Sequence, residues 1–87
     1  MTEETLLVFP CDFPIKMMGR ATAEFPILAR GLVEKHTGPL QEHAIRSALS
    51  RNGRFVSITV TVNAQSRQQL DDIYTDVSAH DDVLIAL

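Results

Sequence analysis

The chain has 87 residues, with eight Lys and Arg against eleven Asp and Glu, which gives a formal net charge of −3. This acidic balance argues against broad non-specific binding of nucleic acid, which needs cations that neutralise phosphates. Cys11 is the only cysteine, which excludes an intramolecular disulfide, and no apolar run approaches the roughly 20 residues of a membrane span. The acidic N-terminus lacks the features of a secretion signal, so we expect a cytoplasmic protein without a membrane partner.

The length is enough for one domain. We assign residues 1–12 to a lead-in and residues 13–87 to that domain. Glu3 and Glu4 are expected to be solvated, and the apolar residues that follow them end at Pro10. These apolar residues predict a loop packed over the core, with an extra edge strand as the alternative.

Residues 13–20 predict the first strand, because apolar residues occupy every second position. Pro14 has no N–H for a sheet ladder, so we expect it at the beginning of this strand. Gly19 permits a bend into the next element.

Residues 22–37 predict the first helix. From Phe25 onward, residues of one stripe recur at i, i+3, i+4, i+7, i+8 and i+11, the spacing of a single helical face. Thr22 is the expected N-cap, and Pro26 is compatible only with the first turn. The sequence Thr-Gly-Pro at 37–39 predicts the end of the helix.

Residues 41–50 have an ambiguous pattern. Their alanine content favours a helix, whereas their length and the following Asn52-Gly53 favour a strand that enters a hairpin, since Asn-Gly supplies positive φ angles. We interpret the segment as the second strand, at a sheet edge, with Ile45 and Leu49 facing the core.

Residues 54–63 predict the third strand and carry the clearest pattern of the chain. Between Phe55 and Val62, four aliphatic residues alternate with three hydroxyl-bearing residues. Residues 66–79 predict the second helix, which begins with a Ser-x-x-Gln capping box. Residues 83–87 predict a closing strand.

This order of elements, βαββαβ, predicts the α+β class and a ferredoxin-like sandwich. Right-handed crossovers place the first and third strands in the centre of a four-stranded antiparallel sheet with strand order 4-1-3-2. Both helices then cover one face of the sheet, and the opposite face is open.

No catalytic or metal-binding pattern is visible. The three histidines are far apart in sequence, no Cys/His spacing resembles a metal site, and the Met-x-Cys-x-x-Cys motif of copper chaperones is absent. We therefore expect no enzyme activity, no metal and no cofactor.

The open face of the sheet is the remaining candidate for a binding site. Hydroxyls beside a cation and a thioether could seat a small carboxylate, with the cation neutralising its charge. The same face could instead contact a partner protein or remain solvated. The candidate residues are Lys16, Met18, Arg20, Ser57, Thr59 and Thr61.

RNA binding is a third possibility, because this architecture can stack bases on aromatic residues of its open face. Phe55 is the only aromatic residue on the third strand, and hydroxyl residues occupy the positions where others would be needed. Arginines at 46, 51 and 54 are explained by a solvated hairpin. The pattern argues against a nucleic-acid partner.

Residues 9–19 spell F-P-x-x-F-x-x-K-x-M-G. Further matching positions are Ser57, Thr61, Asn63, Ala64, Tyr74, Asp81 and Val83. Together they resemble the YbeD-like family of small bacterial proteins over nearly the whole chain. The resemblance implies a fold close to ACT-type regulatory domains, a link to lipoate metabolism and, by analogy with those domains, a homodimer, but no established activity.

Our leading hypothesis is a non-enzymatic regulatory or sensor domain that binds a small carboxylate ligand, with lipoate as one candidate. The competing hypothesis is a protein–protein interaction module that uses its open sheet face or its edge strand.

Overall fold

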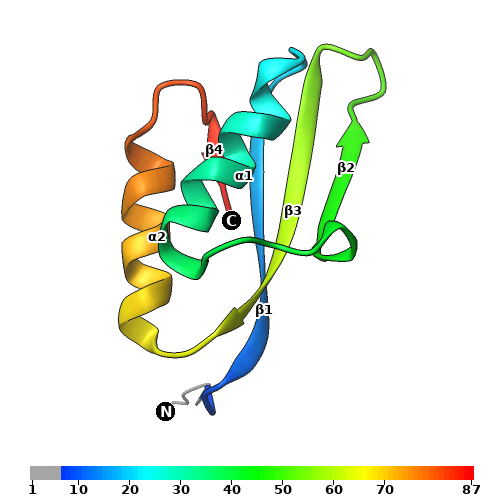
Figure 1. Ribbon diagram of the computed structural model, residues 1–87. Helices are drawn as coiled ribbons and strands as arrows, with labels where there is room; N and C mark the ends of the chain where they lie inside the picture. The colour runs from blue at the N-terminus through cyan, green and yellow to red at the C-terminus, as the bar shows by residue number, and fades with distance from the viewer. Residues whose placement is uncertain (1–6) are drawn as a thin grey trace, which may run out of the picture.

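The computed structural model describes residues 7–87, which form one antiparallel sheet with two helices on one face (Figure 1). The strands follow the order β2-β3-β1-β4, so the predicted ferredoxin-like sandwich and its 4-1-3-2 sheet are confirmed. The elements are β1 (Cys11–Arg20), α1 (Glu24–Thr37), the single 3₁₀ turn η1 (Glu42–Ala44), β2 (Ile45–Leu49), β3 (Phe55–Ala64), α2 (Arg67–Ala79) and β4 (Ile85–Ala86).

The first strand begins earlier than predicted, at Cys11 instead of residue 13, and pairs with β3 from its first residue. Leu7 and Phe9 are partly buried and pack against the core, as the loop interpretation requires. The predicted solvation of Glu3 and Glu4 lies outside the described residues. Within residues 7–87, no helix is long and apolar enough to cross a membrane.

Pro14 lies fourth in β1 and not at its beginning, so that prediction was wrong. The reason is the direction of its backbone groups. The Lys16 N–H donates to the Leu87 carbonyl at 2.9 Å, so even-numbered residues of β1 direct their backbone groups away from β3. The missing N–H of Pro14 therefore removes no bond to β3, and β4 does not extend that far.

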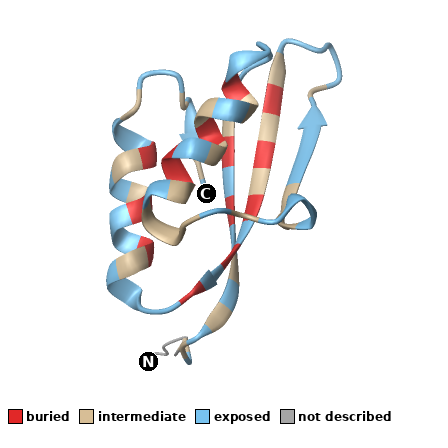
Figure 2. Cartoon of the chain, in the orientation of Figure 1, coloured by how far each residue is buried: buried red, intermediate tan, exposed pale blue. Residues whose placement is uncertain are grey.

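The core lies between the helices and the two central strands, where buried residues alternate along β1 and β3 (Figure 2). Alternate residues of both strands point towards the helices, which follows from the period of two. The largest fully buried side chains are Ile15, Met17, Val33, Ile58, Val60, Val62, Ile73 and Val77.

The predicted Ser66 cap of α2 is confirmed, whereas the N-cap position of α1 is Ala23 and not the predicted Thr22, one residue earlier. In α1, the Phe25 N–H donates to Thr22 Oγ1 at 3.2 Å, and Pro26 lies in the first turn. In α2, the Gln69 N–H donates to Ser66 Oγ at 3.1 Å. The Gln69 side chain also donates to the carbonyl of His36, which ties the start of α2 to the end of α1.

The second strand was only partly predicted, because β2 begins at Ile45 and the residues before it form the turn η1. Arg30 on α1 explains this difference. Its guanidinium donates to the Leu40 carbonyl and to Glu42, both at 2.8 Å, and so holds this segment against the helix. The Leu40 N–H in turn donates to Glu34 Oε2, which lowers the pKa of that carboxyl from its usual value.

Leu49 does not face the core, contrary to the prediction; 67% of its surface is exposed. Its register opposite Val56 does place it on the helix side of the sheet. Figure 1 shows the reason: β2 lies at the edge of the sheet, beyond the two helices. The predicted closing strand is also shorter than expected, since β4 covers only two residues.

A second polar contact between the two helices, centred on Asp76, predicts a pH dependence. Asp76 Oδ2 lies 2.6 Å from His36 Nε2 and 3.4 Å from Lys35 Nζ. The hydrogen bond with His36 is the main cause that lowers the pKa of Asp76 below its ordinary value of 3.8, with Lys35 adding to the effect. The ionised carboxyl is therefore favoured more in the folded state than in the unfolded chain.

We expect the free energy of unfolding to contain a contribution from Asp76 that is present above pH 3.8 and is lost as the pH falls through its lower folded pKa. Urea denaturation should show Asp76→Asn less stable than wild type at neutral pH, with the difference vanishing in acid. The matched control is Asp71→Asn, an exposed carboxyl on the same helix. An Asp76→Asn deficit that persists unchanged in acid would contradict this account.

Candidate functional site

The face of the sheet opposite the helices, here called the open face, is built from alternate residues of all four strands. Its central members are the even-numbered residues of β1 and the odd-numbered residues of β3, which are partly or fully exposed in Figure 2. The cross-strand register sorts them into rows. Each row follows from one backbone pairing, because directly opposed residues share a face.

The row through the middle of the open face carries two cations. Lys16 of β1 is opposite Thr59 of β3, and Thr59 is opposite Arg46 of β2. Adjacent strands lie about 4.8 Å apart, so the two cationic residues start about 10 Å apart with a hydroxyl between them. We call Lys16, Thr59 and Arg46 the cation row.

A hollow of about 250 Å³ lies over the cation row. Its lining is Lys16, Arg46, Ser47, Ala48, Ser57 and Thr59. Among residues 7–87, the ion pairs involve Arg30, Lys35 and His36, so the cation row has no acidic partner there. Asp12, the acidic residue of β1 on this face, lies two rows away from the cation row, beyond the Pro14–Thr61 pair, and accepts a hydrogen bond from Asn63.

An apolar strip borders the cation row on the side of β4. Ile85 is opposite Met18, and Leu87 exchanges two backbone hydrogen bonds with Lys16, at 2.8 and 2.9 Å. Ile85 is 48% exposed and Leu87 is 68% exposed, which is unusual for aliphatic side chains that lie side by side. We call Met18, Ile85 and Leu87 the apolar strip. The centre of the open face is therefore cationic on one side and apolar on the other.

The other two predicted site residues lie apart from this centre. Arg20 places its guanidinium carbon 5.9 Å from the centroid of the Phe55 ring, a cation–π contact that covers one face of the ring. Thr61 lines a separate polar hollow of about 410 Å³ between β3 and η1, together with His43 and Asn63. The described residues contain no cluster of three or more groups that could hold a metal ion there.

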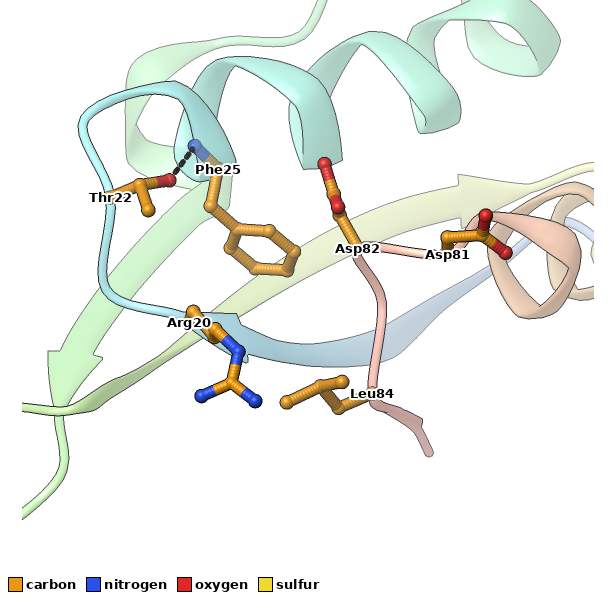
Figure 3. Close-up of a pocket in the computed structure, with 6 residues that line it drawn as sticks. All are labelled: Arg20, Thr22, Phe25, Asp81, Asp82 and Leu84. Atoms are coloured by element: carbon orange, nitrogen blue, oxygen red, sulfur yellow. Dashed lines mark hydrogen bonds between the residues drawn. The ribbon is translucent and has the colours of Figure 1, made fainter.

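Arg20 also lines a small cavity of about 150 Å³ at the start of α1, drawn in Figure 3. The ring of Phe25 projects into this space between Arg20 and the segment that carries Asp82, and the dashed line marks the bond to Thr22. No ion pair joins Arg20 to Asp81 or Asp82 in the described part of the chain. The cavity borders a packing contact of Phe25 and contains no convergent set of reactive groups.

The structure thus brings together three predicted residues, Lys16, Ser57 and Thr59, and places Met18 beside them. It adds Arg46, which sequence reasoning had assigned to a solvated hairpin, and the exposed aliphatic residues of the C-terminal strand. The sequence feature that could have placed Arg46 on the open face is the predicted hairpin turn. A hairpin centred on Asn52-Gly53 pairs residues whose numbers sum to 105, which places Arg46 opposite Thr59.

Fold and face together define a small α+β domain with a single open sheet face. Residues 4–87 match the family described as "Protein of unknown function (DUF493)". The chain is 38% identical to UPF0250 protein NE1487 from Nitrosomonas europaea, over the full length of both chains. It is 41% identical to a UPF0250 protein of Chromobacterium violaceum, covering 98% of this chain and 96% of the relative. The chain belongs to the DUF493/UPF0250 family, which confirms the YbeD-like resemblance.

A solved structure supports the fold independently. The solution structure of protein HP0495 from H. pylori matches with a TM-score of 0.74, covering 99% of this chain and 90% of that one. The sequence identity is 18%, so the likeness concerns the fold alone.

The motif at residues 9–19 divides between the core and the open face. Phe13 contacts Tyr74 edge to face, with the ring centroids 6.5 Å apart, and Gly19 is fully enclosed beside Phe25. Lys16 and Met18 are the motif positions on the open face. Among the motif positions within β1, these two are therefore the ones available to a ligand on the open face.

Proposed function

We propose that this protein is a non-enzymatic regulatory domain that binds an amphipathic carboxylate on its open face. The observation that carries the proposal is the position of the cation row directly beside the apolar strip. A carboxylate can accept charge-assisted hydrogen bonds from Lys16 and Arg46 and a further hydrogen bond from the Thr59 hydroxyl. An aliphatic tail can then cover Met18 and Ile85.

The chemistry of this face selects among small acids. A free amino acid carries an ammonium group beside its carboxylate, and that group would meet the two cations of the row. A fatty acid or a lipoate-like acid has no such group and offers a tail for the apolar strip. The family resemblance adds lipoate metabolism as a source of such acids, so octanoate and lipoate are the probes of choice.

The expected affinity is modest, because the hollow is shallow and its cations are exposed. Exposed ion pairs contribute at most about 1 kcal/mol each. Covering about 100 Å² of apolar surface contributes about 2.5 kcal/mol. A total of about 4 kcal/mol corresponds to a dissociation constant in the millimolar range. That range suits a sensor of a metabolite that accumulates and differs from the tight binding of a cofactor.

Amide NMR of the labelled protein tests the proposal. Titration with octanoate or lipoate should produce saturable shifts confined to residues around Lys16, Arg46, Ser57 and Thr59, with the helix amides unchanged. A panel of free amino acids should produce weaker shifts at the same amides. If no acid changed the amide chemical shifts, the proposal would be rejected. An interaction module whose open face or edge strand contacts a protein would then be favoured.

Two observations weigh against RNA binding and against catalysis on this face. Arg20 already covers one face of Phe55, the aromatic ring that RNA binding on β3 would need for stacking. The hollow over the cation row is lined by hydroxyls and cations, which suit binding of an anion more than acid–base chemistry.

A further inference from the structure

The outer edge of β2 carries backbone groups that no strand satisfies in the described chain. The Ser50 N–H donates to the Phe55 carbonyl at 2.8 Å, and backbone direction alternates along an antiparallel ladder. Arg46 and Ala48 therefore direct their backbone groups towards β3. Ile45, Ser47 and Leu49 direct theirs outward. The Ile45 N–H already donates to the Glu42 carbonyl, so the Ile45 carbonyl and the groups of Ser47 and Leu49 remain for an additional strand.

The opposite edge of the sheet is protected, and β2 is not. Pro14 removes a donor from the outer edge of β1, and β4 covers the neighbouring residues of that strand. Proline on an edge strand is a common protection against pairing with another chain. No proline interrupts Ile45–Leu49. The edge strand on the opposite side, β4, covers only two residues, so within residues 7–87 a long strand edge is offered only by β2.

Two exposed aliphatic residues lie on the helix side of the sheet, one on the edge strand itself and one on α1. Leu49 is 67% exposed and Ile27 of α1 is 74% exposed. Arg30 contacts Leu40 and Glu42, so its face of α1 overlooks the segment that leads into β2. Ile27 lies three residues earlier on the same helical face.

We propose that a second copy of this chain pairs antiparallel with β2, with Ser47 of the two copies directly opposed across a two-fold axis. This register opposes all five residues of the strand, with backbone hydrogen bonds available between the two Ser47 residues and from the Leu49 N–H of each copy to the Ile45 carbonyl of the other. Ile45 of each copy is then opposite Leu49 of the other, which covers Leu49 on the helix side. Arg46 is opposite the small Ala48 on the open face, so no like charges are opposed.

Other two-fold registers are less favourable for stated reasons. A register centred on Arg46 opposes two guanidinium groups at close range, which is destabilising. A register centred on Ala48 places Leu49 opposite Ser47 and leaves Ile45 without a partner residue in the strand. Self-complementarity of the whole strand therefore selects the Ser47-centred pairing. This inference does not depend on the proposed ligand.

Pairing would join the two sheets into one of eight strands with all helices on the same side. The two open faces would become continuous, and Arg46 of the second copy would lie beside Ala48 in the row that contains Ser57. A contact of one strand pair and a few aliphatic side chains is small, so the dimer should dissociate on dilution.

Sedimentation equilibrium of the full chain, from about 10 µM to about 1 mM, tests the proposal. The mass should rise from 9.7 kDa towards twice that value. Ser47→Pro removes an outward N–H without loss of a bond to β3, and Leu49→Lys adds charge to the edge, so both variants should stay monomeric. Val8→Lys is the control, an even more exposed aliphatic residue outside β2, and should dimerise like wild type.

Cross-linking tests the register without depending on the fold of the edge variants. In a Cys11→Ser background, Ser47→Cys should form a disulfide-linked dimer under mild oxidation, because directly opposed residues have Cα atoms about 5.5 Å apart. Thr75→Cys, exposed on α2, should not. The proposal is overturned if wild type is monomeric at every concentration, if both edge variants still dimerise, or if the two cysteine variants cross-link equally.

Discussion

Replacement of Gly19 by alanine is expected to destabilise the fold strongly. A Cβ at this position would lie 2.7 Å from the carbonyl oxygen of Asp82 and would overlap the ring of Phe25. The backbone carbonyl cannot rotate away, so β1 or the segment before β4 must shift. Overpacking of this kind costs about 1–3 kcal/mol. For a domain of this size, the melting temperature should fall by about 5–20 °C, measured by circular dichroism.

Gly31→Ala provides the matched control. Gly31 lies inside α1, and a Cβ there would meet nothing within 4 Å. Alanine should therefore raise the free energy of unfolding, by about 0.5–1 kcal/mol, because glycine is unfavourable in a helix interior. If both variants melted like wild type, the close approach of Phe25 and Asp82 to β1 would be wrong.

The double variant Lys16→Glu/Arg46→Glu is expected to abolish saturable binding of octanoate on the open face. Each exposed ion pair contributes at most about fivefold in affinity. Charge reversal removes both contributions and adds repulsion between the ligand and two carboxylates. From a millimolar starting point, a loss of about tenfold or more leaves no saturation in an NMR titration.

Arg67→Glu is the control for this experiment, and it lowers the net charge by about half as much as the double variant does. Arg67 is exposed on α2, on the opposite side of the molecule from the open face, so its reversal changes the net charge without changing the cation row. Its octanoate affinity should equal that of wild type at moderate ionic strength, where long-range fields are screened. If both proteins lost octanoate binding to the same extent, the cause would be net charge, and the cation row would not be the carboxylate site.

The architecture was predictable because several independent signals agreed. The alternation in residues 55–62, the Ser66 cap and the helical stripe from Phe25 each specify one element, and the element order leaves few topologies. Alternation also predicted which residues of β1 and β3 share the open face. Local pattern is sufficient for these features because it reports directly on which side of an element is buried.

The remaining features depend on contacts between distant residues. Leu49 has the pattern of a core residue, yet no helix reaches the edge strand that carries it. The position of Pro14 within β1 was predicted wrongly, because a proline is tolerated inside a strand when its backbone nitrogen faces away from the neighbouring strand. Arg30 controls where β2 begins through bonds to residues ten and twelve positions away. None of these contacts produces a periodic pattern of residues in the sequence.

The candidate site was predicted in part for the same reason. Lys16, Ser57 and Thr59 follow from alternation on the two central strands, and the register places them in one hollow. Predicting that Arg46 belongs to the site would have required counting residue pairs back from the hairpin turn along β2. The apolar strip required the pairing of residues 85–87 with β1, which the short, apolar C-terminal segment does not specify.

A matched pair of ligands tests the central claim most directly. Wild-type protein would be titrated with octanoate and, separately, with octanamide, which has the same tail and no charge, while the amides of Lys16, Arg46 and Thr59 are followed by NMR. We predict saturable shifts with octanoate and affinity lower by about tenfold for octanamide, because two exposed ion pairs are lost. Equal responses to the two ligands, or no response to octanoate, would contradict carboxylate recognition by the open face.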